Sequence, residues 1–195
     1  MKKIVVVTGL GDDGKATKLI VAGWKKLGLA PIIFVPGWDN DEGVAPKLTR
    51  LNKLIDKESE GKKISLLGIS AGASLAMNAF IKRLNKVEKM VSVCGRLRLG
   101  WSGDKIGRKL QEETLKHLAF KESVEMVEKN IEKLTEDDRK KILTISARLG
   151  DELIPLSTSQ LAGAKNIFVS GLGHVLAIAS AMTVEFEEIK RFLEE

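Results

Sequence analysis

Residues 68–72 read Gly-Ile-Ser-Ala-Gly, a G-x-S-x-G motif with Ser70 at its centre. The motif follows an apolar run and precedes a run of small residues, a pattern that predicts a strand, a sharp turn and a helix. In such a turn the serine is held on a strained backbone, and the two glycines keep neighbouring backbone from clashing. Ser70 is therefore the candidate nucleophile, and the backbone N–H of Ala71 is a candidate oxyanion donor.

A nucleophilic serine needs a base to accept its proton and an acid to orient that base. Of the two histidines, His174 follows the last expected strand, whereas His117 lies in a charged helical segment and is interpreted as a solvated residue. Asp151 follows the preceding strand, with Glu152 as its neighbouring competitor. Ser70, Asp151 and His174 thus each follow a different strand, in the order nucleophile, acid, base that is typical of an α/β architecture.

These three residues need a parallel sheet to bring them together. Short runs rich in Val and Ile alternate with helical periodicity, which predicts a three-layer α/β/α sandwich around a mostly parallel sheet. The chemistry of such a fold lies beyond the carboxyl ends of the strands. About six strands are expected, at 3–7, 31–35, 63–70, 89–94, 141–147 and 166–170, with helices near 16–27, 48–55, 71–84 and 156–163 and a final amphipathic helix that carries Val184, Ile189, Phe192 and Leu193.

The chain has 195 residues and is expected to form a single domain over residues 1–195, because a chain of this length buries about 70% of its unfolded surface in one core. Residues 101–140 are charged and helical without a strand candidate, so they are expected to form an insertion between two strands. Trp38 follows the second strand and Trp101 opens the insertion. Both are candidates for lining an apolar substrate pocket, and packing of the loop and the insertion is an equally favoured alternative.

The segment TGLGDDGKAT, residues 8–17, follows the first strand and contains both G-x-G-x-x-G and most of G-x-x-x-x-G-K. A phosphate loop requires Ser or Thr directly after the lysine, and Ala16 occupies that position. A dinucleotide site requires an acidic residue at the end of the second strand, which has none there. Asp12 and Asp13 would also repel phosphate groups. Neither nucleotide interpretation is favoured, and no cofactor is expected.

Composition excludes several further classes. The net charge is +6, but no long basic block occurs and the chain contains no Tyr for a stacking platform, so nucleic-acid binding is not expected. Cys94 is the single cysteine, which leaves no internal disulfide and no cysteine-built metal site and fits a cytoplasmic location. No apolar stretch approaches the roughly 20 residues that a membrane helix needs, so neither a membrane span nor a signal peptide is expected.

With these motifs the chain resembles the α/β-hydrolase superfamily, and within it the small single-domain serine esterases and carboxylesterases. The resemblance implies a sheet without the first two of the family's eight strands, and a helical cap over the pocket formed by residues 101–140. It also implies that the N–H of Leu10 is the second oxyanion donor, although Thr8 stands where the family usually has histidine. Four segments carry the resemblance, which spans nearly the whole chain: GISAG at 68–72, GDELIP at 150–155, GLGH at 171–174 and TGLGDDG at 8–14.

The resemblance further implies a serine hydrolase that cleaves a small acyl ester through an acyl-enzyme intermediate, with Ser70, His174 and Asp151 as the catalytic triad and neither metal nor organic cofactor. Two alternatives stay open. One is a non-catalytic protein of the same fold that serves as a binding or scaffold module. The other is a different enzyme on the same frame, such as an acyltransferase or a carbon–carbon hydrolase.

Overall fold

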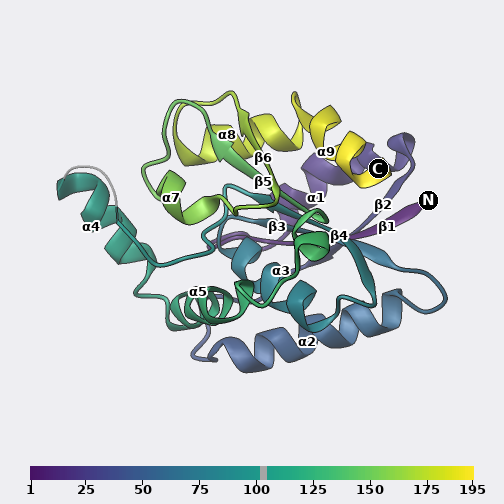
Figure 1. The fold of residues 1–195 in the computed structure, drawn as a ribbon. Helices are drawn as coiled ribbons and strands as arrows, with labels where there is room; N and C mark the ends of the chain where they lie inside the picture. The colour runs from purple at the N-terminus through teal and green to yellow at the C-terminus, as the bar shows by residue number, and fades with distance from the viewer. Residues whose placement is uncertain (102–104) are drawn as a thin grey trace.

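A single parallel sheet forms the centre of the computed structural model, which describes residues 1–101 and 105–195 (Figure 1). Its six strands lie in the order β2-β1-β3-β4-β5-β6. The predicted fold class is confirmed, because each expected apolar run is a strand and every strand pair is parallel. The strands are β1 (Lys2–Val7), β2 (Leu29–Phe34), β3 (Ile64–Ile69), β4 (Val87–Val93), β5 (Ile142–Ala147) and β6 (Lys165–Val169).

Helices cover both faces of the sheet (Figure 1). Successive residues of β1 point to opposite faces, with Val5 and Val7 in one core and Ile4 and Val6 in the other. All four side chains are fully buried, which explains why the strand reads as an unbroken apolar run. The helices are α1 (Lys15–Val21), the 3₁₀ helix η1 (Ala22–Leu27), α2 (Val44–Glu58), α3 (Ala71–Lys82), α4 (Lys105–Thr114), α5 (Leu118–Ile131), α6 (Glu136–Arg139), α7 (Leu156–Ser159), α8 (Gly173–Met182) and α9 (Phe186–Glu194).

The segment expected as a cap divides into parts with different surroundings, and its residues 102–104 lie outside the described residues. Helix α5 packs in the same layer as α2 and α3, since its apolar residues recur at helical spacing and are buried. Polar contacts fix it there: the Asn78 amide donates to the Ser123 carbonyl at 2.8 Å, and Glu122 accepts from the Val44 N–H at 2.7 Å. Helix α5 is thus part of the sandwich, and the cap role stays a prediction that now concerns α4, which projects from the body in Figure 1.

The C-terminal segment is two helices, not the single final helix that the periodicity predicted. The chain turns between α8 and α9, where the Glu185 carboxylate accepts from the Ser180 hydroxyl at 2.7 Å and from the Ser170 N–H at 2.6 Å. Val184 lies in this turn and is 86% exposed, so its assignment to the apolar stripe was wrong. The three other predicted stripe residues are buried in α9, namely Ile189, Phe192 and Leu193.

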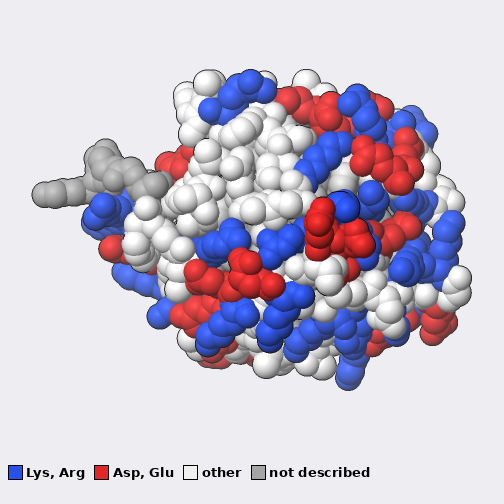
Figure 2. Space-filling view, in the orientation of Figure 1, with Lys and Arg blue, Asp and Glu red and all other residues white. Residues whose placement is uncertain are grey.

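The surface carries charges of both signs. On the face that Figure 2 shows, lysine and arginine side chains are interspersed with acidic ones, and an uncharged area lies over α7 and the adjoining ends of β5 and β6. Within the described residues, no helix combines the length and apolar character that a bilayer crossing requires.

Candidate active site

Ser70 lies at the junction of β3 and α3 on a strained backbone, with φ 52° and ψ −121°. Non-glycine residues rarely adopt a positive φ, and here the tight turn enforces it. A Cβ at Gly68 would lie 2.3 Å from the Ala73 Cα, and a Cβ at Gly72 would lie 2.3 Å from the Val7 carbonyl oxygen. Both glycines of the motif are therefore required by close backbone approach, which holds the serine out at the carboxyl edge of the sheet.

The structure brings the three residues predicted as a triad into one hydrogen-bonded chain. The Nε2 atom of His174 lies 2.8 Å from the Ser70 Oγ, and its Nδ1 atom lies 2.7 Å from an Asp151 carboxylate oxygen. With its proton on Nδ1, the ring donates to the carboxylate and accepts from the serine hydroxyl. Such an arrangement can move the serine proton to the imidazole while the carboxylate stabilises the resulting cation.

The carboxylate of Asp151 is oriented by backbone. Its second oxygen accepts from the N–H groups of Leu153 at 2.9 Å and Ile154 at 2.8 Å, in the turn that follows β5. The side chains of Asp151 and His174 are 7% and 5% exposed, so their contact is shielded from water. The competitor Glu152 instead accepts from the backbone N–H of His174 at 3.0 Å and thereby holds the start of α8. The sequence prediction placed His174 before a helix, and it lies in the first turn of one.

The loop after β1 lies against the serine, as the predicted second oxyanion donor requires. A Cβ at Gly9 would come within 3.1 Å of the Ser70 Cβ, so the two backbones are in close contact. In the part of the chain that the structure describes, the backbone N–H groups of Leu10 and Ala71 donate no hydrogen bond to another protein group. Their role as oxyanion donors stays a prediction.

Polar groups of the TGLGDDG loop bond to one another. The Thr8 hydroxyl donates to the Asp12 carbonyl at 3.2 Å, and the Asp12 carboxylate accepts from the Gly14 N–H at 2.7 Å and from the Thr17 hydroxyl. Asp12 thus holds the loop against the start of α1. The Gly14 N–H already donates to its carboxylate and is not free to bind a phosphate. Glycines at positive φ, such as Gly14 at 87°, give the loop its tight path.

Trp38 fixes this loop from the other side. Its indole N–H donates to the Thr8 carbonyl oxygen at 3.1 Å, and its ring packs edge-on against Phe120 of α5. The side chain is 5% exposed and belongs to the core. Trp101, in contrast, is 48% exposed and lies over the Arg96 guanidinium, 5.3 Å from the ring centre.

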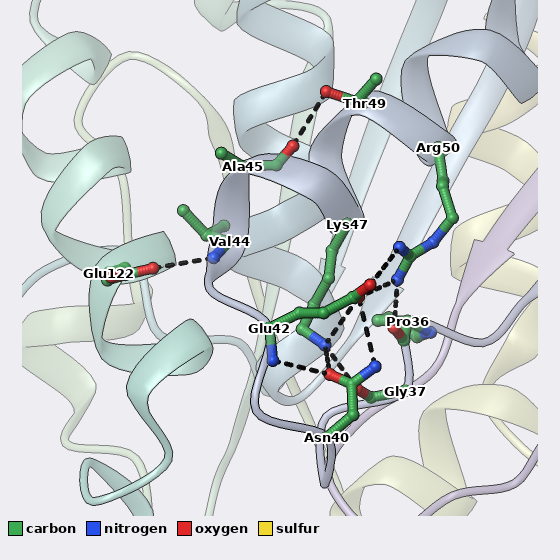
Figure 3. A network of polar contacts seen from close by, with 10 residues as sticks. All are labelled: Pro36, Gly37, Asn40, Glu42, Val44, Ala45, Lys47, Thr49, Arg50 and Glu122. Carbon is green, nitrogen blue, oxygen red and sulfur yellow. Dashed lines mark hydrogen bonds and ion pairs between the residues drawn. The ribbon is translucent and has the colours of Figure 1, made fainter.

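The segment that carries Trp38 is itself held by a buried lysine (Figure 3). Lys47 of α2 donates to the carbonyl oxygen of Gly37 and to the side-chain oxygen of Asn40, and lies 3.8 Å from the Glu42 carboxylate. Burial lowers the pKa of Lys47, and Glu42 partly opposes that effect. Lys47 thus holds the chain on both sides of Trp38, and the Trp38 indole in turn bonds to the loop beside Ser70.

A cavity of about 360 Å³ opens beside Ser70 and His174, between α1 and α8. Neither Trp38 nor Trp101 lines it, which differs from the sequence prediction because Trp38 points into the core and Trp101 points outward. The predicted site residues Leu10, Ser70 and His174 line it, whereas sequence reasoning missed the apolar side chains of its walls, although two signals were present. Apolar residues recur one turn apart at the start of α1, and others directly follow His174: Ala16, Ile20, Val175, Ile178 and Ala179.

Cys94 directly follows β4 and is buried. Burial, and to a lesser extent the negative charge of Asp151, raises the pKa of its thiol to about 12. The thiol is therefore protonated at neutral pH, which makes it a poor nucleophile. Among the described residues, no group of three or more His, Cys, Asp or Glu is placed to hold a metal ion.

Several solved structures share this architecture. A hydrolase from Oleispira antarctica aligns with a TM-score of 0.69 at 12% identity, covering 100% of this chain and 92% of its own. An alpha/beta hydrolase from a sediment metagenome of the Mar Chica lagoon in Morocco aligns at 0.56 and 19%, covering 99% and 89%. A structure reported for the metagenome-derived lipolytic enzymes LipS and LipT aligns at 0.63 and 11%, covering 99% and 94%. No family model and no curated protein sequence matches the chain. On its topology and these structural matches, the chain has the α/β-hydrolase fold.

Proposed function

We propose that this protein is a serine hydrolase that cleaves carboxylic esters of small molecules. The observation that carries the proposal is the unbroken chain of hydrogen bonds from Asp151 through His174 to Ser70, with Ser70 held at a positive φ. A free serine hydroxyl is a weak nucleophile, and a hydrogen-bonded base activates it. The hydrolases, esterases and lipolytic enzymes among the structural neighbours support the same class.

In the first half of the reaction, Ser70 attacks the ester carbonyl while His174 takes its proton. The carbonyl oxygen becomes an oxyanion, for which the N–H groups of Leu10 and Ala71 are the candidate donors. Asp151 stabilises the imidazolium and keeps the ring oriented. His174 then gives its proton to the departing alcohol oxygen, so the carbon–oxygen bond breaks and an acyl-serine remains.

In the second half, a water molecule replaces the alcohol. His174 accepts a proton from the water, whose oxygen attacks the acyl carbon, and the Ser70 oxygen leaves and takes that proton back. Every protein group that the scheme uses belongs to this chain, and the His174 imidazole acts as base and then as acid in each half.

Hydrolysis of p-nitrophenyl acetate tests the proposal. Ser70→Ala removes the nucleophile and retains the alanine-sized volume of the turn, so the enzymatic release of p-nitrophenol is expected to fall about 10⁴-fold or more. The matched control is Ser74→Ala, since Ser74 lies one turn along the same helix and its hydroxyl bonds to Ser123 of α5 at 2.9 Å. Equal rates for the wild type and Ser70→Ala would refute the proposal and favour the scaffold alternative.

A further inference from the structure

The walls of the cavity beside Ser70 are mostly aliphatic. One wall comes from α1, with Ala16 and Ile20, and the facing wall comes from α8, with Val175 and Ile178. Its volume of about 360 Å³ lies at the small end of the range for small-molecule pockets. An apolar group that enters this space loses its contact with water on both sides.

The polar side chains in the lining, apart from Ser70 and His174, already have protein partners. The Asp12 carboxylate accepts from the Gly14 N–H and from the Thr17 hydroxyl, as described above. The Asp13 carboxylate forms an exposed ion pair with Lys15 at 2.7 Å. A substrate chain that carried hydroxyl or amide groups would have to give up its bonds to water without compensation here.

The lining also lacks a cation. The structure describes all the residues that line the cavity, and none of them is Lys or Arg, while Asp12 and Asp13 contribute carboxylates. A negatively charged chain would meet the half-buried Asp12 carboxylate as a like charge, whereas Asp13 is exposed and paired with Lys15.

We propose that this groove between α1 and α8 binds the aliphatic chain of an uncharged ester, so that the substrate class is the short- to medium-chain aliphatic esters. The inference rests on the proposed hydrolase function and adds the part of the substrate that the groove selects. Burial of each methylene is worth about a fourfold gain in kcat/KM while the chain stays between the two helices. Beyond the groove the gain levels off, because Val175 at the rim is 70% exposed and a longer chain meets water there.

The test measures kcat/KM for the p-nitrophenyl esters of acetate, butyrate, hexanoate and octanoate. The expected result is a rise from acetate to hexanoate of about fourfold per methylene and a smaller rise from hexanoate to octanoate. The hemisuccinate ester, which matches butyrate in carbon number and carries a carboxylate, is expected to react about tenfold or more slowly than butyrate.

Two variants on one helix localise the effect. Ala16 lines the groove and is exposed, so Ala16→Phe fills the groove without disturbing the core. It is expected to abolish the preference for hexanoate over acetate, because the loss in kcat/KM grows with each methylene that the filled groove no longer accepts. Leu19→Phe is the matched control, since Leu19 is 80% exposed on the same helix and does not line the groove. It is expected to keep the wild-type preference.

The outcomes separate the groove from the chemistry. A flat chain-length series, or an Ala16→Phe variant with the wild-type preference, overturns the groove assignment, and labelling of Ser70 by a small fluorophosphonate probe would then leave the hydrolase proposal standing. If neither labelling nor ester hydrolysis occurs in the folded protein, the hydrolase proposal fails and the groove inference fails with it.

Discussion

The substitution Asp151→Asn, which replaces one carboxylate oxygen by an NH₂ group, tests whether Asp151 orients His174. In the wild type, one oxygen of Asp151 accepts from the N–H groups of Leu153 and Ile154, and the other faces the Nδ1 atom of His174. The two backbone donors will hold the amide oxygen of the asparagine on their side. Its NH₂ group must then face the histidine ring as a donor.

This orientation forces the wrong tautomer on His174. A ring that accepts at Nδ1 carries its proton on Nε2, and Nε2 can then no longer accept the proton of Ser70. The same substitution in a Ser-His-Asp protease lowers kcat about 10⁴-fold, which corresponds to about 5 kcal/mol of transition-state stabilisation. We expect a loss of that size in kcat/KM for p-nitrophenyl butyrate.

Stability separates this explanation from a loss of structure. Asparagine keeps both backbone hydrogen bonds, so the free energy of unfolding should change by about 1 kcal/mol or less. Asp151→Ala leaves two N–H groups without an acceptor and should cost about 1–3 kcal/mol for each. Urea denaturation followed by circular dichroism measures both values.

Glu152→Gln is the matched control. Within the described residues, the Glu152 carboxylate accepts one hydrogen bond, from the backbone N–H of His174. A glutamine side-chain oxygen can accept the same bond. The rate is expected to change less than about tenfold. A loss in Asp151→Asn below about tenfold, or an equal loss in Glu152→Gln, would refute the assignment of Asp151 as the orienting acid.

Three further predictions concern the surroundings of the site. Trp38→Phe keeps the packing on Phe120 but leaves the Thr8 carbonyl without its donor. In steady-state assays kcat should therefore fall about tenfold with KM nearly unchanged. The control Trp24→Phe lies in the core on the other face of the sheet and should leave kcat unchanged. Because burial raises the pKa of Cys94 to about 12, iodoacetamide at neutral pH should label it only after unfolding, and rapid labelling of the native protein, read by mass spectrometry, would contradict its inert role. Hydrogen bonds from Arg83 and Lys86 lower the pKa of Asp56 to about 2. The stability that the Asp56 carboxylate adds is therefore present above its ordinary pKa of 3.8 and is lost as the pH falls through 2. Asp56→Asn should lower the melting temperature at neutral pH, and the difference from the wild type should vanish near pH 2.

The central strands could be predicted most directly, because β3 and β5 are buried along their whole length and β1 is buried from Ile4 to Val7. Each of these strands therefore reads as a short apolar run. These runs alternate along the chain with segments of helical periodicity, so the signal is local. The positions of Ser70, Asp151 and His174 followed from the same regularity, since each residue follows a different strand and the carboxyl ends of parallel strands meet at one edge.

Features that depend on tertiary contacts were not predictable in the same way. Trp38 follows a strand and Trp101 opens the insertion, and these positions fit a pocket residue as well as a packing residue. Only the fold reveals that Trp38 turns inward and donates to the Thr8 carbonyl. Helix α5 reads as a charged amphipathic segment, and its burial depends on α2 and α3, which present a matching apolar face. The turn that separates α8 from α9 depends on Glu185, whose two partners are not obvious from sequence.

The most direct test of the central claim is covalent labelling with a small fluorophosphonate probe, followed by peptide mass mapping. The wild type should carry one adduct, on Ser70. His174→Ala should lose that adduct while retaining its circular dichroism spectrum and melting behaviour, because the serine then has no base. A folded wild type without an adduct, or a His174→Ala variant that is labelled at the wild-type rate, would contradict the claim that His174 activates Ser70.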